Sequence, residues 1–183
     1  MKTLYYLLDT LFNLYLMVII MRIWLQWVRA DFYNPLSQFA VKATHPVVGP
    51  LRRIIPSVGG VDLAAVLFAY VVAMLKFVCF ALLGGVAPNL LAILLFAPLL
   101  VLKQAGSLLF WMLVVRAIMS WVSQGRSTLD YVLFQLTEPL LAPIRRFIPP
   151  MAGLDLSVLL LFIALQALNY LMADLLGQLW VML

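Results

Sequence analysis

The sequence has few of the side chains from which proteins build chemical centres. Its 183 residues include one cysteine, Cys79, and one histidine, His45. A single cysteine cannot close an internal disulfide, and a zinc or haem site needs more ligands than this chain supplies. The sequence has neither a glycine-rich phosphate loop nor a close pair of acidic residues. It therefore predicts a protein that is not an enzyme and needs no cofactor.

Charge is also scarce. Only 10% of the residues are charged and 66% are hydrophobic, whereas about a quarter of a soluble domain is charged. Such a chain cannot cover itself with polar surface, so its expected partner is the lipid bilayer and not nucleic acid. The composition predicts an all-α membrane protein. The expected spans of about twenty residues are 4–28, 62–84, 100–122 and 155–176.

One apolar stretch does not fit this division. Residues 87–102 carry Pro88 and Pro98 and precede the third span. Three interpretations are open: a short membrane-dipping helix at 88–99, an early kinked part of a long third helix, and a fifth span. A helix of 90–102 alone is too short to cross the membrane.

The basic residues predict an orientation. Seven of them lie in the segments between spans one and two and between spans three and four, whereas the other side has only Lys2 and Lys103. By the positive-inside rule, these two segments are predicted to be cytoplasmic and both termini to lie on the opposite side of the membrane. The seven residues are Arg29, Lys42, Arg52, Arg53, Arg126, Arg145 and Arg146.

The chain repeats itself. The pattern T-x-P-x-x-x-P-x-R-R-x-I-P occurs at 44–56 and again at 137–149, and residues 34–67 share twelve identities with residues 127–160 without a gap. Each copy has two spans, so the copies are parallel. The sequence predicts a tandem repeat of two helix–loop–helix units, 1–86 and 87–183.

Each inter-span segment is expected to begin with a short amphipathic cytoplasmic helix. Asn34 and Ser127 are the expected N-caps, and apolar residues follow at helical spacing. The prolines are then expected to end the helix and hold the chain extended, so that the double arginine lies in a stiff, proline-framed segment. The prolines are Pro46, Pro50 and Pro56 in the first copy and Pro139, Pro143 and Pro149 in the second.

The arginine pairs, Arg52/Arg53 and Arg145/Arg146, are the first candidate site. They could serve only as a topology signal that binds anionic lipid head groups nonspecifically. The recurrence of the same prolines at the same spacing favours presentation to a specific lipid or protein partner. A membrane-protein partner and a homo-oligomer both fit this interpretation.

Charged residues near the span ends suggest structural ion pairs. Arg22 and Arg116 lie inside the ends of spans one and three, and Asp62 and Asp155 begin the following spans as expected N-caps. Snorkelling alone could explain the arginines. The sequence predicts instead the pairs Arg22–Asp62 and Arg116–Asp155. His45, aligned with Glu138, is interpreted as a loop residue.

Lys76 lies in the middle of the second span. An ionisable group at membrane depth suggests a function, although a lysine stem can also reach the interface. The candidate intramembrane partners are Asp9, Asn13 and Asp174, and Asn169 is the residue aligned with Lys76.

The doubled T-x-P-x-x-x-P-x-R-R-x-I-P motif, with "RIWLQWV", "DFYNPLSQF" and "AIMSWVSQGRS", resembles the YggT family, whose plastid and Gram-positive relatives are called YlmG. The resemblance covers essentially the whole chain and points to the two-repeat proteobacterial form. It implies a multi-pass integral protein of the bacterial inner membrane, whose termini would be periplasmic. Family members are connected with cell division, envelope or thylakoid organisation, plastid cytochrome maturation, or osmotic and potassium stress.

Two functions follow as expectations. The first is a scaffold or assembly factor that presents the basic segments and serves envelope homeostasis, cell division or osmotic tolerance. The second is a small oligomeric channel or ion-handling protein for osmotic or potassium homeostasis. Its path would be lined by Lys76, Asp9, Asn13, Asn169 and Asp174.

Overall fold

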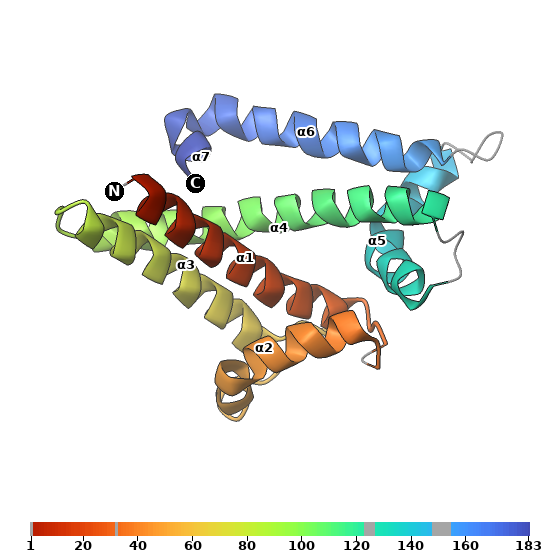
Figure 1. Cartoon of the computed structure of the whole chain (residues 1–183), viewed down its shortest axis with the longest axis horizontal. Helices are drawn as coiled ribbons and strands as arrows, with labels where there is room; N and C mark the ends of the chain where they lie inside the picture. The colour runs from red at the N-terminus through yellow and green to blue at the C-terminus, as the bar shows by residue number, and fades with distance from the viewer. Residues whose placement is uncertain (1, 32, 123–126, 148–154) are drawn as a thin grey trace. The chain divides into compact units, whose positions relative to one another are not determined.

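The computed structural model describes residues 2–31, 33–122, 127–147 and 155–183. All regular elements in these ranges are helices, so the predicted all-α class is confirmed. The helices are α1 (Lys2–Trp27), α2 (Pro35–Leu51), α3 (Leu63–Leu83), α4 (Leu90–Val122), α5 (Thr128–Phe147), α6 (Leu156–Leu176) and α7 (Gln178–Met182) (Figure 1).

Four of these helices, α1, α3, α4 and α6, are long and apolar enough to cross a membrane. Three agree closely with the predicted spans. The fourth, α4, is a continuous helix of 33 residues with Pro98 inside it. Of the three interpretations of 88–99, the structure supports the second, in which this stretch is the early part of a long helix. Because 90–99 continues directly into the span, it is neither a separate element nor a fifth crossing. The chain is a multi-pass membrane protein.

The chain forms two compact units, Met1–Ala105 and Gly106–Leu183, with the boundary inside α4. In the first unit α3 packs along α1, and α2 packs against both near the end of α1 and the start of α3 (Figure 1). Three alanines four residues apart on α3, Ala65, Ala69 and Ala73, are fully buried. Small residues at this spacing let two helix backbones approach closely.

The second unit has the same order of elements: the C-terminal part of α4, then α5, then α6. Phe110 of α4 and Phe162 of α6 meet edge to face with ring centroids 5.2 Å apart, and α5 packs against α6. Ser157 is the buried residue of α6. Most exposed side chains of α6 are apolar, as expected for a helix that lipid surrounds, although Gln166, Asn169 and Asp174 are also exposed.

Polar side chains cap the helices as the sequence predicts. The Asn34 side chain accepts from Ser37 N at 2.8 Å at the start of α2. At the start of α5, Ser127 Oγ accepts from Asp130 N at 3.1 Å, while the Asp130 carboxylate accepts from Ser127 N. Asp62 and Asp155 cap α3 and α6 in the same way. The caps satisfy backbone amides that have no partner within the helix.

The expectation that the prolines end the helix is wrong for the first two prolines of each copy, and Pro149 lies outside the described residues. Pro46 and Pro50 lie inside α2, and Pro139 and Pro143 lie inside α5, so both helices continue to the arginine pair. The four-residue spacing puts both missing amide donors on one face of the helix. Continuing the helix also buries Val48 in α2 and Leu141 in α5 completely. Tertiary packing thus outweighs the local preference of proline.

Removing the first cap tests this account of α2. We expect Asn34→Ala to lower the free energy of unfolding by about 1 kcal/mol, because Ser37 N would lose its acceptor. Thermal unfolding in a maltoside detergent, followed by circular dichroism, measures the change. Tyr33→Ala, at a side chain 89% exposed, is the control. Equal midpoints for the two variants would contradict the capping role.

Candidate functional site

Asp62, at the start of α3, binds an arginine at the end of α2. Arg52 Nη2 lies 2.5 Å from Asp62 Oδ2, and Arg52 Nε donates to the same oxygen at 2.8 Å. Arg22 of α1 lies on the same carboxylate, with Nε 3.8 Å from Oδ2. Asp62 is fully buried. The structure thus brings Arg22 and Asp62 together. It adds Arg52, which the sequence analysis assigned to partner contact and not to this ion pair.

Arg22 also connects α1 to α2 through a threonine. Its Nη1 donates to Thr44 Oγ1 at 2.7 Å, and Thr44 Oγ1 donates to Ala40 O at 2.7 Å within α2. Arg22 is only 2% exposed. Its Nε has no hydrogen-bond partner, since 3.8 Å to Asp62 is an ion-pair distance and too long for a hydrogen bond.

The second unit repeats the network with one added carboxylate. Arg116 donates to Thr137 Oγ1, which donates to Leu133 O at 2.7 Å. Arg145 Nη2 lies 2.5 Å from Asp155 Oδ2. Glu138 accepts from Arg145 Nη1 at 2.8 and 2.9 Å and lies 3.8 Å from Arg116. Within the described ranges, the predicted direct pair Arg116–Asp155 is not formed, because Glu138 takes Arg116 and Arg145 takes Asp155.

The two ionised groups at the base of α6 stabilise each other. Burial alone would raise the pKa of Asp155, but hydrogen bonds from Ser157 and Arg145 and the arginine charge bring that pKa below its ordinary value. Burial would likewise lower the pKa of Arg145, whereas the hydrogen bond and charge of Asp155, together with Glu138, raise it. Both side chains are therefore charged at neutral pH.

The two arginines of each pair have different environments. The first, Arg52 or Arg145, binds the aspartate of its own unit. The second, Arg53 or Arg146, is exposed. The sequence analysis treated all four as one kind of residue, but the structure separates the two that bind an aspartate, Arg52 and Arg145, from the exposed Arg53 and Arg146.

Lys76 lies in a polar cluster between α3 and α1. Its Nζ is 2.8 Å from Asp9 Oδ1 and donates to Asn13 Oδ1 at 2.8 Å. Asn13 Nδ2 donates to Asp9 Oδ2 at 2.9 Å. The Lys76 side chain is 6% exposed and that of Asp9 45%. Three of the five intramembrane candidates therefore lie together in the first unit.

The other two candidates belong to the second unit. Asn169 accepts a hydrogen bond from Trp180 Nε1 at 2.8 Å, which connects α6 to α7. Asp174 is exposed on α6. Asn169 thus bonds to the neighbouring helix α7, whereas Lys76, its aligned residue, binds Asp9 and Asn13 of α1.

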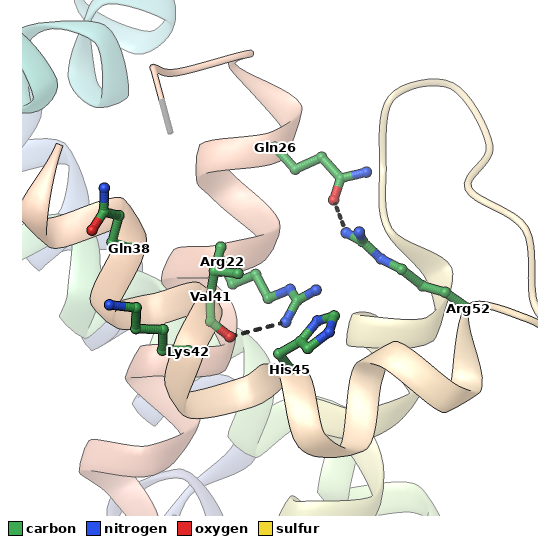
Figure 2. Close-up of a pocket in the computed structure, with 7 residues that line it drawn as sticks. All are labelled: Arg22, Gln26, Gln38, Val41, Lys42, His45 and Arg52. Atoms are coloured by element: carbon green, nitrogen blue, oxygen red, sulfur yellow. Dashed lines mark hydrogen bonds between the residues drawn. The ribbon is translucent and has the colours of Figure 1, made fainter. Parts of the chain in front are cut away.

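A pocket of about 600 Å³ lies between α1 and α2 beside the Arg22 network. It is lined by Arg22, Gln26, Gln38, Val41, Lys42, His45 and Arg52. Figure 2 shows the guanidinium of Arg22 near the imidazole of His45, and Arg52 extending from the end of α2 to hydrogen-bond Gln26. His45 is part of α2, so its interpretation as a loop residue is wrong.

A family model described as CCB3/YggT matches residues 1–83 and 95–176. The chain belongs to the CCB3/YggT family. This confirms the resemblance that the sequence motifs carry, and the two matched stretches fit a two-repeat form. The family match says which family the chain belongs to, but it does not assign a reaction to the residues described above.

Several curated YggT-type relatives match nearly the full chain. An uncharacterized protein in the proC 3′ region of Vibrio alginolyticus is 62% identical over 184 residues, covering 98% of both chains. The uncharacterized protein YggT of Escherichia coli K12 is 49% identical over 176 residues, covering 96% of this chain and 92% of the relative. An uncharacterized protein of Haemophilus influenzae is 42% identical over 173 residues, covering 94% and 93%. No solved structure matches significantly.

Sequence reasoning missed three members of the two networks in this YggT-family chain. Thr44 and Thr137 are identical at aligned positions, and this signal was sufficient to connect them with the repeated Arg22 and Arg116. Glu138 has no counterpart in the first copy, so the repeat gave no indication of its role. No group of three His, Cys, Asp or Glu side chains in the described ranges could hold a metal ion.

Neutralising each aspartate separately compares how much the two networks contribute to the stability of the fold. We expect Asp62→Asn to lower the free energy of unfolding by about 3 kcal/mol, because it leaves the buried Arg22 without a counter-charge. Asp155→Asn should cost about 1 kcal/mol or less, since Glu138 still neutralises the arginines and the site is partly exposed. Thermal unfolding in one detergent compares them. Equal losses of stability would contradict the unequal burial of the two networks.

Proposed function

We propose that this protein is a non-enzymatic scaffold or assembly factor of the bacterial inner membrane. In this role α2 and α5 lie on the cytoplasmic side and both termini are periplasmic, consistent with the excess of basic residues beside these helices. The cellular process served would be envelope homeostasis, cell division or tolerance of osmotic stress.

One observation carries the proposal: in each unit an aspartate binds the first arginine of the pair, and the second arginine is exposed. Arg52 and Arg145 bind Asp62 and Asp155 at 2.5 Å, which fixes the end of α2 and of α5. Arg53 and Arg146 follow on the exposed side. A side chain carried by a fixed helix end loses less conformational entropy when it binds than one on a free loop.

The surroundings of Arg53 favour an anionic partner at the membrane surface. Ile54, the next residue, is 81% exposed, so a basic and an apolar group are presented side by side. This combination suits lipid head groups or a membrane protein with an acidic rim, and a second copy of the chain is a further possible partner.

Photo-cross-linking tests the scaffold role. A photoreactive residue in place of Ile54 is expected to form a defined adduct, with protein or with lipid, in native membranes. Arg53→Gln with Arg146→Gln should reduce that adduct at least fivefold, because about 1 kcal/mol of attraction is lost per arginine. Lys76→Leu is the control and should leave it unchanged. An adduct that persists in the double arginine variant would count against the proposal.

The Lys76 cluster favours a second candidate function, an oligomeric ion-handling protein. A buried lysine bound to Asp9 and Asn13 within apolar helices is the kind of group found on ion pathways. This function predicts potassium flux in liposomes that contain only the purified protein. The flux should be lost in Lys76→Leu and remain normal in Arg53→Gln. Liposomes without flux would exclude it.

A further inference from the structure

The pocket between α1 and α2 has more positive than negative charge. Three cationic side chains, Arg22, Lys42 and Arg52, line it, and Asp62 is the carboxylate that binds the two arginines. Lys42 lies on α2, three residues before His45 and on the same side of the helix. The first unit therefore gathers three positive charges and one negative charge around a cavity, an excess of two positive charges that favours binding of an anion.

The second unit shows how the same arginines are neutralised from within. The residues aligned with Lys42 and His45 are Gln135 and Glu138. Glu138 lies against both arginines of its unit, at 2.8 Å from Arg145 and 3.8 Å from Arg116. Two carboxylates there balance two arginines, so that network is complete.

The corresponding space is also filled differently. A pocket in the second unit is lined by Arg116, Ser120, Asp130, Tyr131 and Phe134 and measures about 270 Å³, compared with about 600 Å³ in the first. The Arg116 guanidinium lies over the Phe134 ring, 5.2 Å from its centroid. The aligned residue in the first unit is the smaller Val41. The first pocket is thus larger and lacks the internal carboxylate.

His45 lines this pocket because the helix leaves room for its ring. A Cβ at Gly49, four residues later on α2, would lie 3.1 Å from His45 Cε1, closer than ordinary contact. The second unit has Ala142 at the aligned position, beside the thinner Glu138 side chain. The imidazole adds a polar group to the pocket that can donate a hydrogen bond.

Arg22 has a buried donor, Nε, that makes no hydrogen bond. The residue is 2% exposed, and its Nη1 is bound by Thr44. A buried guanidinium donor without an acceptor is costly. An oxyanion in the adjoining pocket would supply one, as Glu138 supplies charge to Arg116.

We propose that the pocket lined by Arg22, Lys42, His45 and Arg52 binds a phosphate monoester. Such a group carries about −1.5 to −2 charge at neutral pH and three acceptor oxygens, which match two unbalanced cations and the donors around them. The volume lies within the range of ordinary ligand sites. The phosphate can come from a lipid head group of the phosphatidic acid type or from a soluble phosphate. This site uses residues other than Arg53 and Arg146, so it does not depend on the scaffold role.

Calorimetric titration of the purified full chain in maltoside detergent tests the proposal. The probes are inorganic phosphate and, separately, dihexanoyl phosphatidic acid below its micelle concentration, against chloride at equal ionic strength. One site per chain is expected for at least one probe. Binding of phosphatidic acid alone identifies the head group as the ligand, whereas equal binding of both identifies the phosphate itself. Absence of binding by both probes overturns the proposal.

Two variants that install second-unit residues should remove the site without harming the fold. His45→Glu supplies an internal carboxylate and should weaken binding at least tenfold, with an unfolding midpoint no lower than that of the parent. Lys42→Gln should weaken binding about fivefold, the effect of one cation near an anionic group.

Arg29→Gln is the matched control, because it removes the same charge as Lys42→Gln from an exposed position that does not line the pocket. Its dissociation constant should stay within twofold of the parent value. Equal weakening by Lys42→Gln and Arg29→Gln, or full binding by His45→Glu, would show a general surface-charge effect and overturn the assignment. The cross-linking result at Ile54 has no bearing on this titration, so the two proposals can fail separately.

Discussion

A charge near the apolar part of a bilayer is stable only when an opposite charge and hydrogen bonds match it. In this protein the charges that must be matched are those of Asp62 and Asp155, the N-caps of the second spanning helix in each unit. Each carboxylate both caps a helix and binds the arginine ten residues before it. The position of α2 on α1 and α3 follows from this contact, as does that of α5 on α6.

The two units share this arrangement and differ in how completely it is neutralised. Arginine, threonine and aspartate occur at aligned positions in both networks, whereas the residues around them diverge. Glu138 neutralises charge in the second network, and the Arg116 guanidinium lies over the Phe134 ring. In the first, Lys42 and His45 line an open pocket. The two copies of a duplicated chain can thus diverge. The second copy neutralises its arginines with its own carboxylates, while the first keeps a pocket that is able to accept a ligand.

Much of the fold could be predicted because its signals are local or repeated. Span length, the capping residues Asn34 and Ser127, and the recurring Arg22/Arg116 and Asp62/Asp155 positions are all visible in the sequence. The continuation of α2 through Pro46 and Pro50 could not be predicted, because it depends on the burial of Val48 by distant residues. The partner of Arg116 was likewise hidden, since Glu138 breaks the repeat and its reach to two arginines depends on the helical shape of α5.

The direction of the contacts along the chain has a consequence for how the protein is made. The arginines that bind Asp62, Arg22 and Arg52, both precede it in sequence, and Arg145 and Glu138 precede Asp155. A chain emerging from the ribosome therefore has each aspartate's counter-ion available before the aspartate itself appears. The second span of a unit can enter the bilayer with the aspartate at its start already neutralised.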